Sequence, residues 1–322
     1  MAVNSYISNS KSMNKFIKFA GYLLTVAVLF FAIDFAAGYV FDHYFFLKND
    51  AKLQYAFEGG SGEEIIILGS SRASHHYVPS VFEEEMGLSC YNYGMDGRNI
   101  FNHYVVASEL FKNSILRPKL VIFDASHIDI VDAPGWNGEK LSNLFLLYKK
   151  DRNVREIVDN EDKVTGIVLR YCNMYRYNSL LISLFRTSFK SEQSENTLRG
   201  YLPLYTEWAN DIETVTIDEP FKIYPPKEKY LRKLLSDCSE MGIKVFVIVS
   251  PYYELYSKPL GWIKDIEDIC NDFNVFFLDY SQDSLFLEHK EWFNEPFHLN
   301  DQGAREFTSI LVKELINSNN NN

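Results

Sequence analysis

The longest apolar run of the chain lies near its N-terminus. Residues 19–41 read FAGYLLTVAVLFFAIDFAAGYVF, with Asp34 as the single charge. At 1.5 Å per residue a helix of this length spans about 34 Å, which is enough to cross a hydrocarbon core of about 30 Å. Three lysines precede the run and only one follows closely, so the positive-inside rule places the N-terminus in the cytoplasm. The pattern predicts a transmembrane helix at 19–41, with the following chain outside the cytoplasmic membrane.

A buried helix of a soluble protein and a cleaved signal peptide are the alternatives for this run. Its uninterrupted length and its aromatic outer end favour an uncleaved signal anchor. Asp34 is costly in hydrocarbon unless it faces a partner helix or lies near the outer interface, so it indicates a partner in the membrane. Around the anchor we expect a cytoplasmic tail at 1–18 and a linker at 42–61.

Strand-length apolar runs alternate with helical patterns in the remaining chain. This order is typical of a parallel sheet with crossover helices. The expected strands are 64–68, 89–93, 120–124, 243–249 and 275–278, and the expected helices are 99–116, 226–241, 260–274 and 301–317.

The alternation predicts an α/β fold of three layers, flavodoxin-like in type, over residues 62–318. Residues 135–225 interrupt it without clean alternation, and we interpret them as an insertion or cap on the same domain because one sheet needs strands from both sides. Residues 319–322 are a frayed tail.

Composition narrows the function. The 322 residues include 32 Lys and Arg against 43 Asp and Glu, a net charge of −11, and no basic cluster stands out, so nucleic acid is a poor partner. Four cysteines without a CxxC pair exclude a disulfide scaffold and the common zinc spacing. His75, His76 and His127 lack the HxxxH spacing of a helical metal site, so we expect no metal and no cofactor.

Polar groups follow the ends of several expected strands, where ligands bind in open α/β sheets. They are Ser71, the turn 92–97, His127, and Glu295 with His298. Ser71 lies at a strand-to-helix turn and either caps the helix or acts as a nucleophile. Glu295 and His298 are three residues apart, so the carboxylate can orient the imidazole as a general base. A hydrogen bond between Ser71 and His298 would favour catalysis, whereas side chains facing apart would favour a binding protein.

These blocks resemble the SGNH/GDSL hydrolase superfamily over roughly residues 62–318. The similar segments are Ile67-Leu-Gly-Ser-Ser71-Arg, Asn92-Tyr-Gly-Met-Asp-Gly97 and Glu295-Pro-Phe-His298-Leu-Asn. The resemblance implies Ser71 as nucleophile, His298 as base and Glu295 in the usual Asp place.

The resemblance also implies an oxyanion hole made by the Ser71 N–H with Gly97, or less favourably Gly94. The chain departs from the family at three places. Ser70 replaces the Asp before the nucleophile, and Glu295 is one methylene longer than Asp. Asp124-Ala-Ser-His127 stands where the third block carries Asn, so His127 or Ser126 has to donate instead.

Other polar and aromatic residues are weaker candidates for substrate contact. His75 lies one helical turn after Ser71 and either lines the site or sits on a solvated helix face. The loop from Gly200 to Leu204 looks rigid enough to overhang the site. The remaining candidates, each of which is otherwise core or surface, are Arg72, Tyr201, Tyr205 and Trp208.

The resulting prediction is a membrane-anchored serine esterase or O-acyltransferase acting outside the cytoplasm. The resemblance implies acylated, especially acetylated, surface polysaccharide as substrate and a membrane-bound O-acyltransferase as partner, besides the lipid bilayer. One alternative is a catalytically degenerate protein of the same fold that binds polysaccharide or such a partner. A second alternative is a lipid-directed esterase.

Overall fold

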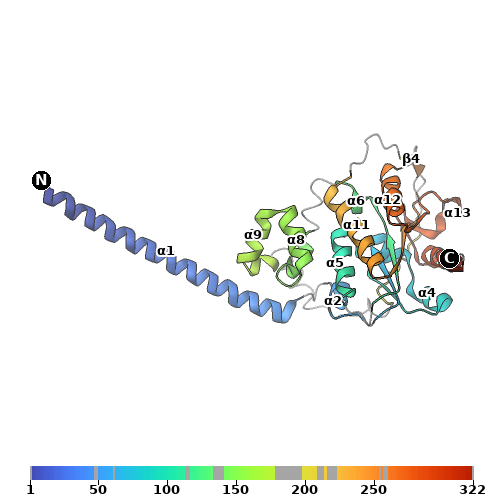
Figure 1. The fold of residues 1–322 in the computed structure, drawn as a ribbon, viewed down its shortest axis with the longest axis horizontal. Helices are drawn as coiled ribbons and strands as arrows, with labels where there is room; N and C mark the ends of the chain where they lie inside the picture. The colour runs from blue at the N-terminus through green and yellow to red at the C-terminus, as the bar shows by residue number, and fades with distance from the viewer. Residues whose placement is uncertain are drawn as a thin grey trace. The chain divides into compact units, whose positions relative to one another are not determined.

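The structure, a computed structural model, describes residues 2–46, 50–60, 62–112, 117–132, 141–177, 198–208, 214–215, 223–253, 255–256 and 260–320. The chain forms two compact units (Figure 1). The helical unit comprises Met1–Asn49 and Phe145–Ser188, and the α/β unit comprises Asp50–Leu144 and Phe189–Asn322. The expected insertion at 135–225 is therefore divided, because 145–188 belongs with the N-terminal helix and not with the sheet.

The α/β unit is built on a five-stranded parallel sheet in the order β2-β1-β3-β5-β7. In chain order within the sheet this is 2-1-3-4-5, the flavodoxin-like doubly wound order. The prediction of an α/β fold with a parallel sheet is confirmed. The strands are β1 (Ile65–Gly69), β2 (Cys90–Asn92), β3 (Leu120–Asp124), β5 (Lys244–Val249) and β7 (Phe276–Asp279).

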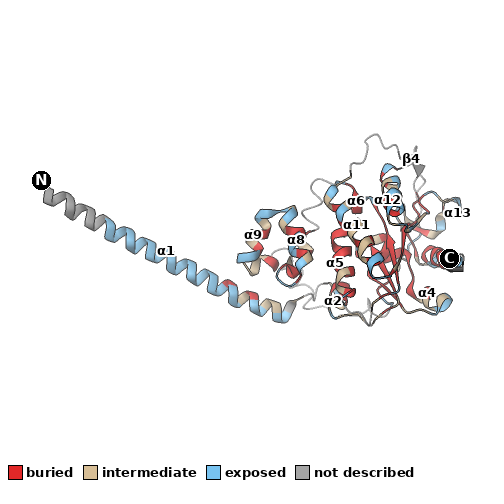
Figure 2. Ribbon diagram, in the orientation of Figure 1, coloured by how far each residue is buried: buried red, intermediate tan, exposed pale blue. Residues whose placement is uncertain are grey.

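Side chains of the central strands are apolar on both faces, as a sheet covered on both sides requires. Ile65 and Ile67 of β1 pack into a core that includes Phe307 and Leu311 of the last helix. Ile66 is equally buried but points to the opposite layer, because successive side chains of a strand alternate. Figure 2 shows this burial concentrated in the strands and the inner helix faces.

Helices cover the two faces in the pattern that right-handed crossovers dictate. On one face α3 and α4 pack against α14, and on the other α11 packs against α5 and α6. Figure 1 shows α5 and α11 on one side of the sheet and α4 on the other. The helices of this unit are α2 (Ala51–Phe57), α3 (Ser71–His76), α4 (Pro79–Met86), α5 (Ile100–Leu110), α6 (His127–Ile130), α11 (Pro225–Glu240), α12 (Gly261–Asp272), α13 (Ser284–Leu287) and α14 (Asp301–Asn320).

Two small strand pairs and short helical turns complete the unit. The antiparallel pair β8 and β9 precedes α14 and is important for the site below. The expected linker at 42–61 contains the helix α2, and α14 runs past the expected end at 317. The remaining elements are β4 (Thr214–Val215), β6 (Leu255–Tyr256), β8 (Phe293–Glu295), β9 (His298–Leu299), the 3-10 turn η3 (Lys290–Trp292), and η1 (Ser142–Leu147), which straddles the boundary between the units.

The helical unit contains α1 (Ala2–Phe45), α8 (Arg152–Glu161), α9 (Lys163–Tyr171) and the 3-10 turn η2 (Met174–Tyr177). Within the described residues one helical stretch, Met13–Tyr44, is long and apolar enough to cross a membrane. Asp151 and Asp162 cap the starts of α8 and α9 with their carboxylates, which fixes where both helices begin. The sequence also suggests a mixed helical stretch at 167–189 and a polar run at 190–196, and the part of these beyond residue 177 lies outside the described residues.

Asp34 does not need a partner helix from another protein. Its carboxylate accepts hydrogen bonds from the backbone N–H groups of Asn173 and Met174, at 2.7 and 2.9 Å. The side chains of Cys172 and Asn173 donate to it as well. The sequence predicts a partner in the membrane for this carboxylate. In the structure its partner is a segment of the same chain, residues 172–174.

Candidate active site

The site lies at the carboxyl end of the sheet, where β1 leads into α3. Gly69 ends β1 with φ of +143°, and a Cβ there would lie 2.7 Å from the carbonyl oxygen of Asp124. Only glycine fits this close approach of β1 to β3. The chain then turns so that Ser71 becomes the first residue of α3, at the edge of the sheet between β1 and β3 where the strand order reverses.

A tight hairpin brings His298 and Glu295 together. β8 and β9 are antiparallel, and Glu295 stands directly opposite His298 across a two-residue turn. Directly opposed side chains of such a pair lie close enough to interact. The three-residue spacing in the sequence therefore brings the two side chains together because they are paired across a hairpin.

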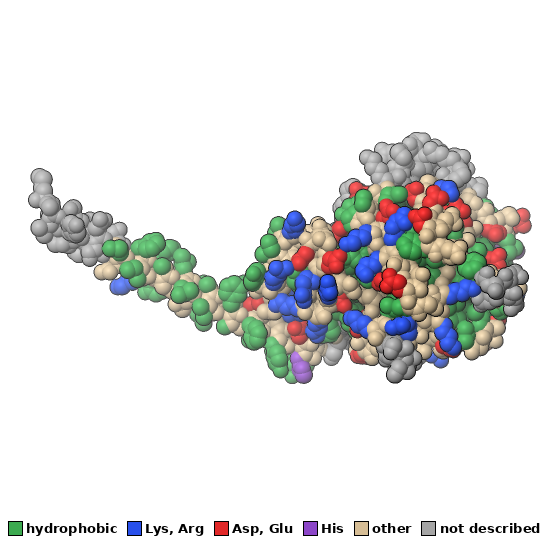
Figure 3. Space-filling view, viewed as in Figure 1, with side chains coloured by type: hydrophobic (Ala, Val, Ile, Leu, Met, Phe, Trp, Pro, Cys, Tyr) green, Lys and Arg blue, Asp and Glu red, His purple; other side chains and the backbone are tan. Residues whose placement is uncertain are grey.

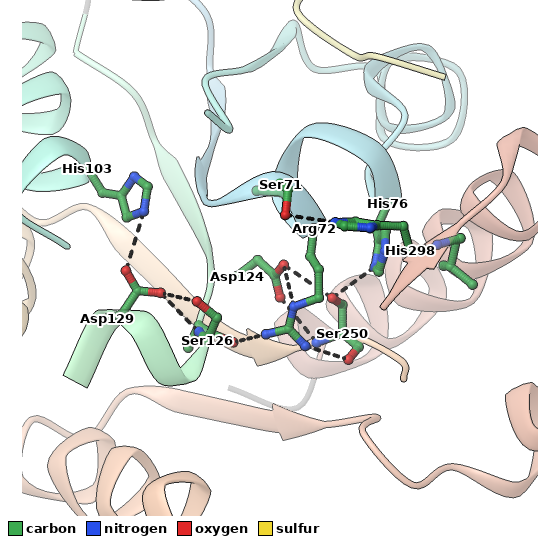
Figure 4. A network of polar contacts seen from close by, with 12 residues as sticks. Ser71, Arg72, His76, His103, Asp124, Ser126, Asp129, Ser250 and His298 are labelled. Carbon is green, nitrogen blue, oxygen red and sulfur yellow. Dashed lines mark hydrogen bonds and ion pairs between the residues drawn. The ribbon is translucent and has the colours of Figure 1, made fainter. Parts of the chain in front are cut away.

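Ser71, His298 and Glu295 form a continuous hydrogen-bonded row. The Ser71 Oγ lies 2.7 Å from His298 Nε2, and His298 Nδ1 contacts Glu295 Oε1 (Figure 4 shows the first of these contacts). Because a carboxylate only accepts, Nδ1 carries the proton and Nε2 is free to accept from Ser71. The row remains open to solvent, since the side chain of His298 is 23% exposed.

The Glu295 carboxylate stays ionised. Burial alone would raise its pKa, but the hydrogen bonds from His298 and from the N–H of Phe297 lower the pKa below its ordinary value. An ionised carboxylate behind Nδ1 fixes the tautomer and stabilises an imidazolium that forms during proton transfer.

A second, buried histidine holds the segment that carries His298. His76 Nε2 accepts the backbone N–H of Leu299 at 3.0 Å, so its proton must be on Nδ1, which lies 2.9 Å from Ser250 Oγ. Ser250 Oγ in turn donates to Asp124 Oδ2 at 3.1 Å. Burial, helped by the nearby His298 and Arg72, lowers the pKa of His76 well below its ordinary value and keeps the ring neutral. The ends of β3, β5 and β9 are thereby joined beneath the site (Figure 4).

Arg72 does not point toward a substrate as expected. Its guanidinium is buried, donates to the carbonyl oxygens of Ala125 (2.6 Å) and Ser250 (3.2 Å), and stacks on the Tyr252 ring. Asp124 lies 3.9 Å away. Buried carbonyl groups at loop ends need donors, and Arg72 supplies them to two loops at once. Its role is to fix the strand ends that surround Ser71.

In the turn 92–97, the second of the family-like segments, Gly94 has a structural role. The Gly94 N–H donates to Asn92 Oδ1 at 2.8 Å, and a Cβ at Gly94 would lie 2.4 Å from the Ser74 nitrogen. Gly94 therefore packs against α3 and its N–H is already used. Gly97, with φ of +65°, remains the oxyanion candidate of this block.

In the third segment, residues 124–127, the side chain available as a hydrogen-bond donor is His127 and not Ser126. The Ser126 hydroxyl donates to Asp129 Oδ2 at 2.7 Å and is buried, so it is committed to that carboxylate. His127 begins α6 at the carboxyl end of β3 and is exposed. Its position at the same sheet edge as Ser71 leaves the imidazole as the available donor of this block.

His75 lines the site, and it brings with it a carboxylate that sequence reasoning missed. The His75 ring is buried, not solvated, with its centroid 5.3 Å from that of His298. Its Nε2 lies 3.3 Å from Asp96 Oδ2. Burial alone would raise the pKa of Asp96. The hydrogen bond and charge of His75, with a hydrogen bond from Ser74 and the charge of Lys52, lower this pKa to about 2. The acidic residue within the turn 92–97 was the available signal.

The loop after residue 198 packs along α3, and its aromatic side chains differ in their exposure. The Leu202 N–H donates to the Ser74 carbonyl at 3.0 Å. Tyr201 is buried and donates to Asp301 Oδ1 at 3.0 Å, so it belongs to the core and not to a substrate contact. Tyr205 is 77% exposed, and Trp208 packs edge-on against Tyr253. Of the aromatic candidates, Tyr205 alone presents its ring freely to solvent.

Ser250 and Tyr252 are further residues at this edge of the sheet that no motif in the sequence marks. Both follow the end of β5, so the same rule that found Ser71 and His127 would have found them. Across the part of the chain that the structure describes, no cluster of three or more His, Cys, Asp or Glu is arranged to hold a metal ion.

Among the solved structures similar to this chain are esterases and a lipase. An acetylxylan esterase from Geobacillus stearothermophilus is 11% identical, with a TM-score of 0.38, covering 78% of this chain and 93% of its own. A GDSL-like lipase from Bacteroides thetaiotaomicron is 12% identical, with a TM-score of 0.40, covering 84% and 99%. A protein named as an acylhydrolase from Bacteroides fragilis is 11% identical, with a TM-score of 0.42, covering 84% and 98%. No family model and no curated protein matches the sequence.

Proposed function

We propose that this chain is a membrane-anchored serine esterase or O-acyltransferase that acts outside the cytoplasm on acyl, in particular acetyl, esters of surface polysaccharide. The observation that carries the proposal is the 2.7 Å contact between Ser71 Oγ and His298 Nε2, with ionised Glu295 behind the ring. A nucleophile, a base and a group that orients the base are the minimum for this chemistry.

In the proposed reaction His298 Nε2 takes the Ser71 proton as Oγ attacks the ester carbonyl. The alcohol of the substrate leaves with that proton, and an acyl group remains on Ser71. Water, or a sugar hydroxyl in the transferase case, then attacks the acyl-enzyme while His298 again accepts the proton. His298 returns this proton to Ser71 Oγ as the acyl–Oγ bond breaks, and the acid or the acylated sugar leaves. Glu295 stays ionised and stabilises the imidazolium in both steps.

The negative oxygen of each tetrahedral intermediate needs donors at the same edge. The Ser71 N–H at the start of α3, the Gly97 N–H and the His127 ring are the groups proposed for this role. His127 takes the place of the third-block Asn of the resembling family.

Anchoring and substrate class rest on different observations. The apolar helix α1 and the lysines before it support an anchor with a cytoplasmic N-terminus. The polysaccharide substrate and a membrane-bound O-acyltransferase partner rest on the family resemblance of the three blocks. The acidic chain, at −11, suits an uncharged sugar ester better than a polyanion.

A fluorophosphonate probe tests the proposed chemistry directly. We expect the full-length wild-type chain to be labelled, Ser71→Ala to be unlabelled, and Ser70→Ala to be labelled like the wild type. Ser70 is a matched control because it neighbours Ser71 and its side chain makes no helix-cap hydrogen bond. A folded wild-type chain that is not labelled would favour the non-catalytic alternative.

Comparing ester substrates tests the substrate class. We expect hydrolysis of acetylated oligosaccharides to exceed that of long-chain acyl esters. The reverse order would favour the lipid-directed esterase and overturn the glycan proposal while leaving the serine chemistry intact.

A further inference from the structure

Along α1, the side chains change from exposed to partly covered by protein at Asp34. From Met13 to Ile33 every large apolar side chain of α1 is more than half exposed. Asp34 is the first buried residue, at 5% exposure, and it accepts the four hydrogen bonds from residues 172–174 described above. The apolar surface of α1 is therefore bare from Met13 to Ile33 and covered on one face from Asp34 onward.

Two further contacts continue this covered face. A Cβ on Gly38 would lie 2.3 Å from the Asn173 Cβ, so the segment and the helix are in close contact there. One turn later the Asp42 carboxylate accepts hydrogen bonds from Nη1 and Nη2 of Arg176, at 3.0 and 2.9 Å, and one from the Tyr177 hydroxyl. Asp34, Gly38 and Asp42 are four residues apart and thus form one stripe of α1.

Counted back from Asp34, the exposed part of α1 is long enough to cross a bilayer. The 21 residues from Met13 to Ile33 span about 31 Å, close to the hydrocarbon thickness of about 30 Å. Lys15 and Lys18 lie in the first turns, where long side chains reach the headgroups. A polar segment such as 172–174 is not tolerated in hydrocarbon facing lipid, so it belongs outside the core. These constraints place Asp34 at the outer boundary of the membrane.

At that boundary α9 presents an apolar stripe of its own. Val164, Ile167 and Tyr171 are 71, 57 and 65% exposed and lie at helical spacing on one face. The opposite face packs on α8, where Gly166 leaves no room for a Cβ beside Asp159. In the described residues no element of the helical unit covers the stripe, and Figure 1 shows α9 nearer than α8 to the bare part of α1.

The charge around this stripe suits a lipid surface. Lys163 and Arg170 flank the apolar residues on α9. Over residues 145–177 Lys and Arg outnumber Asp and Glu by seven to five, whereas the whole chain carries −11. Figure 3 shows Lys and Arg side chains gathered over this part of the molecule. Basic residues beside an apolar stripe are typical of helices that lie in the membrane interface.

We infer that the segment 145–177 is seated on the outer surface of the bilayer, with Val164, Ile167 and Tyr171 of α9 inserted among the lipids. The membrane span is then Met13–Ile33, toward the N-terminus of the expected 19–41, and the carboxylates of Asp34 and Asp42 fasten the segment to the helix. The inference rests on the proposed anchoring by α1, because the stripe continues the apolar surface of that helix onto the interface.

Tryptophan fluorescence in vesicles tests this placement. The four native tryptophans lie outside the helical unit, so the wild-type emission serves as background. Full-length Ile167→Trp is reconstituted in phosphatidylcholine and phosphatidylglycerol vesicles that contain brominated phosphatidylcholine. We expect the new tryptophan to lose about half of its emission, more with bromine near the headgroup than near the chain end, because an interfacial helix inserts only shallowly. Arg155→Trp, at an exposed position of α8, is the control and stays unquenched.

Two substitutions on α1 calibrate depth in the same vesicles. Leu24→Trp lies near the middle of Met13–Ile33 and should be quenched most by bromine near the chain end, whereas Ile33→Trp should behave like Ile167→Trp. Deepest quenching at position 33 would overturn the shifted span.

The outcomes separate this inference from the anchor itself. Wild-type chain that resists carbonate extraction, with unquenched Ile167→Trp, would leave the anchor in place and overturn the seating of α9. That result would assign the stripe to a protein partner or a second copy. Release of the wild type by carbonate would overturn the anchor and the inference together, while esterase labelling of Ser71 would be unaffected.

Discussion

The His76 ring and the backbone N–H of Leu299 share a hydrogen bond of 3.0 Å inside the core, one residue from His298. Because Ser250 and Asp124 hold the other side of the same ring, the position of His298 depends on a buried chain of polar contacts that no solvent molecule competes with. His76 therefore acts as a positioning residue for the proposed base.

Replacing His76 tests this dependence. His76→Phe keeps an aromatic ring but removes both contacts, and we expect kcat to fall by about tenfold or more with KM little changed, since small misplacements of a base are costly. His76→Gln offers an oxygen to the Leu299 N–H and should recover part of the loss. Steady-state kinetics on an acetyl ester measures both. A folded Phe variant with wild-type kcat would show that β9 holds His298 without His76.

The strand-end rule explains why Ser71, His127 and the late hairpin residues were predictable from sequence. Parallel strands end at one edge, so residues that follow them are brought together whatever their distance in the chain. The rule specifies an edge but not an orientation. Arg72 is the example, because its side chain turns inward to two carbonyl groups whose need for donors depends on loops more than 50 residues away.

Partners across long sequence separations were not predictable either. Asp34 pairs with residues about 140 positions later, and neither helical nor strand periodicity encodes such a contact. For the same reason the sequence pattern places residues 145–177 in a cap on the α/β domain. A carboxylate in an apolar run did signal a missing partner, but the partner lies in the same chain.

The Glu295 carboxylate gives a prediction about charge and reach. Glu295→Gln keeps the shape but removes the charge behind His298, and we expect kcat to fall by about a hundredfold or more. Glu295→Asp keeps the charge but draws it back by one methylene in a fixed hairpin, so a smaller loss of about tenfold is expected. Rates of fluorophosphonate labelling and of ester hydrolysis measure both. Equal activity in all three proteins would remove Glu295 from the mechanism.

Two glycines give a matched pair for stability. At Gly94 a Cβ would lie 2.4 Å from the Ser74 nitrogen, whereas at Gly261 no atom lies within 4 Å. We expect Gly94→Ala to lower the free energy of unfolding by about 2 kcal/mol or more, because the turn must move away from α3. Gly261→Ala, in the first turn of α12, should be neutral or stabilise by up to about 1 kcal/mol. Denaturant unfolding of the detergent-solubilised chain compares them, and equal effects would contradict the close packing at Gly94.

The burial of neutral His76 makes stability depend on pH in a defined direction. Its pKa in the folded chain lies well below the ordinary value because of burial and the neighbouring His298 and Arg72. In the unfolded chain the ring binds a proton near pH 6.5, so the unfolded state takes up more protons below that pH and stability falls as pH decreases. The stabilisation is fully present above about pH 6.5. Lowering the pH from about 7.5 to 5.5 should lower the free energy of unfolding by about 1.4 kcal/mol.

The variant His76→Gln serves as the control, because glutamine cannot titrate and the other groups affect both proteins alike. Urea unfolding of the two solubilised proteins at both pH values should therefore show the wild type losing about 1.4 kcal/mol more than the variant. Parallel losses in both would mean that His76 is protonated in the folded chain, which the hydrogen bond from the Leu299 N–H to Nε2 forbids.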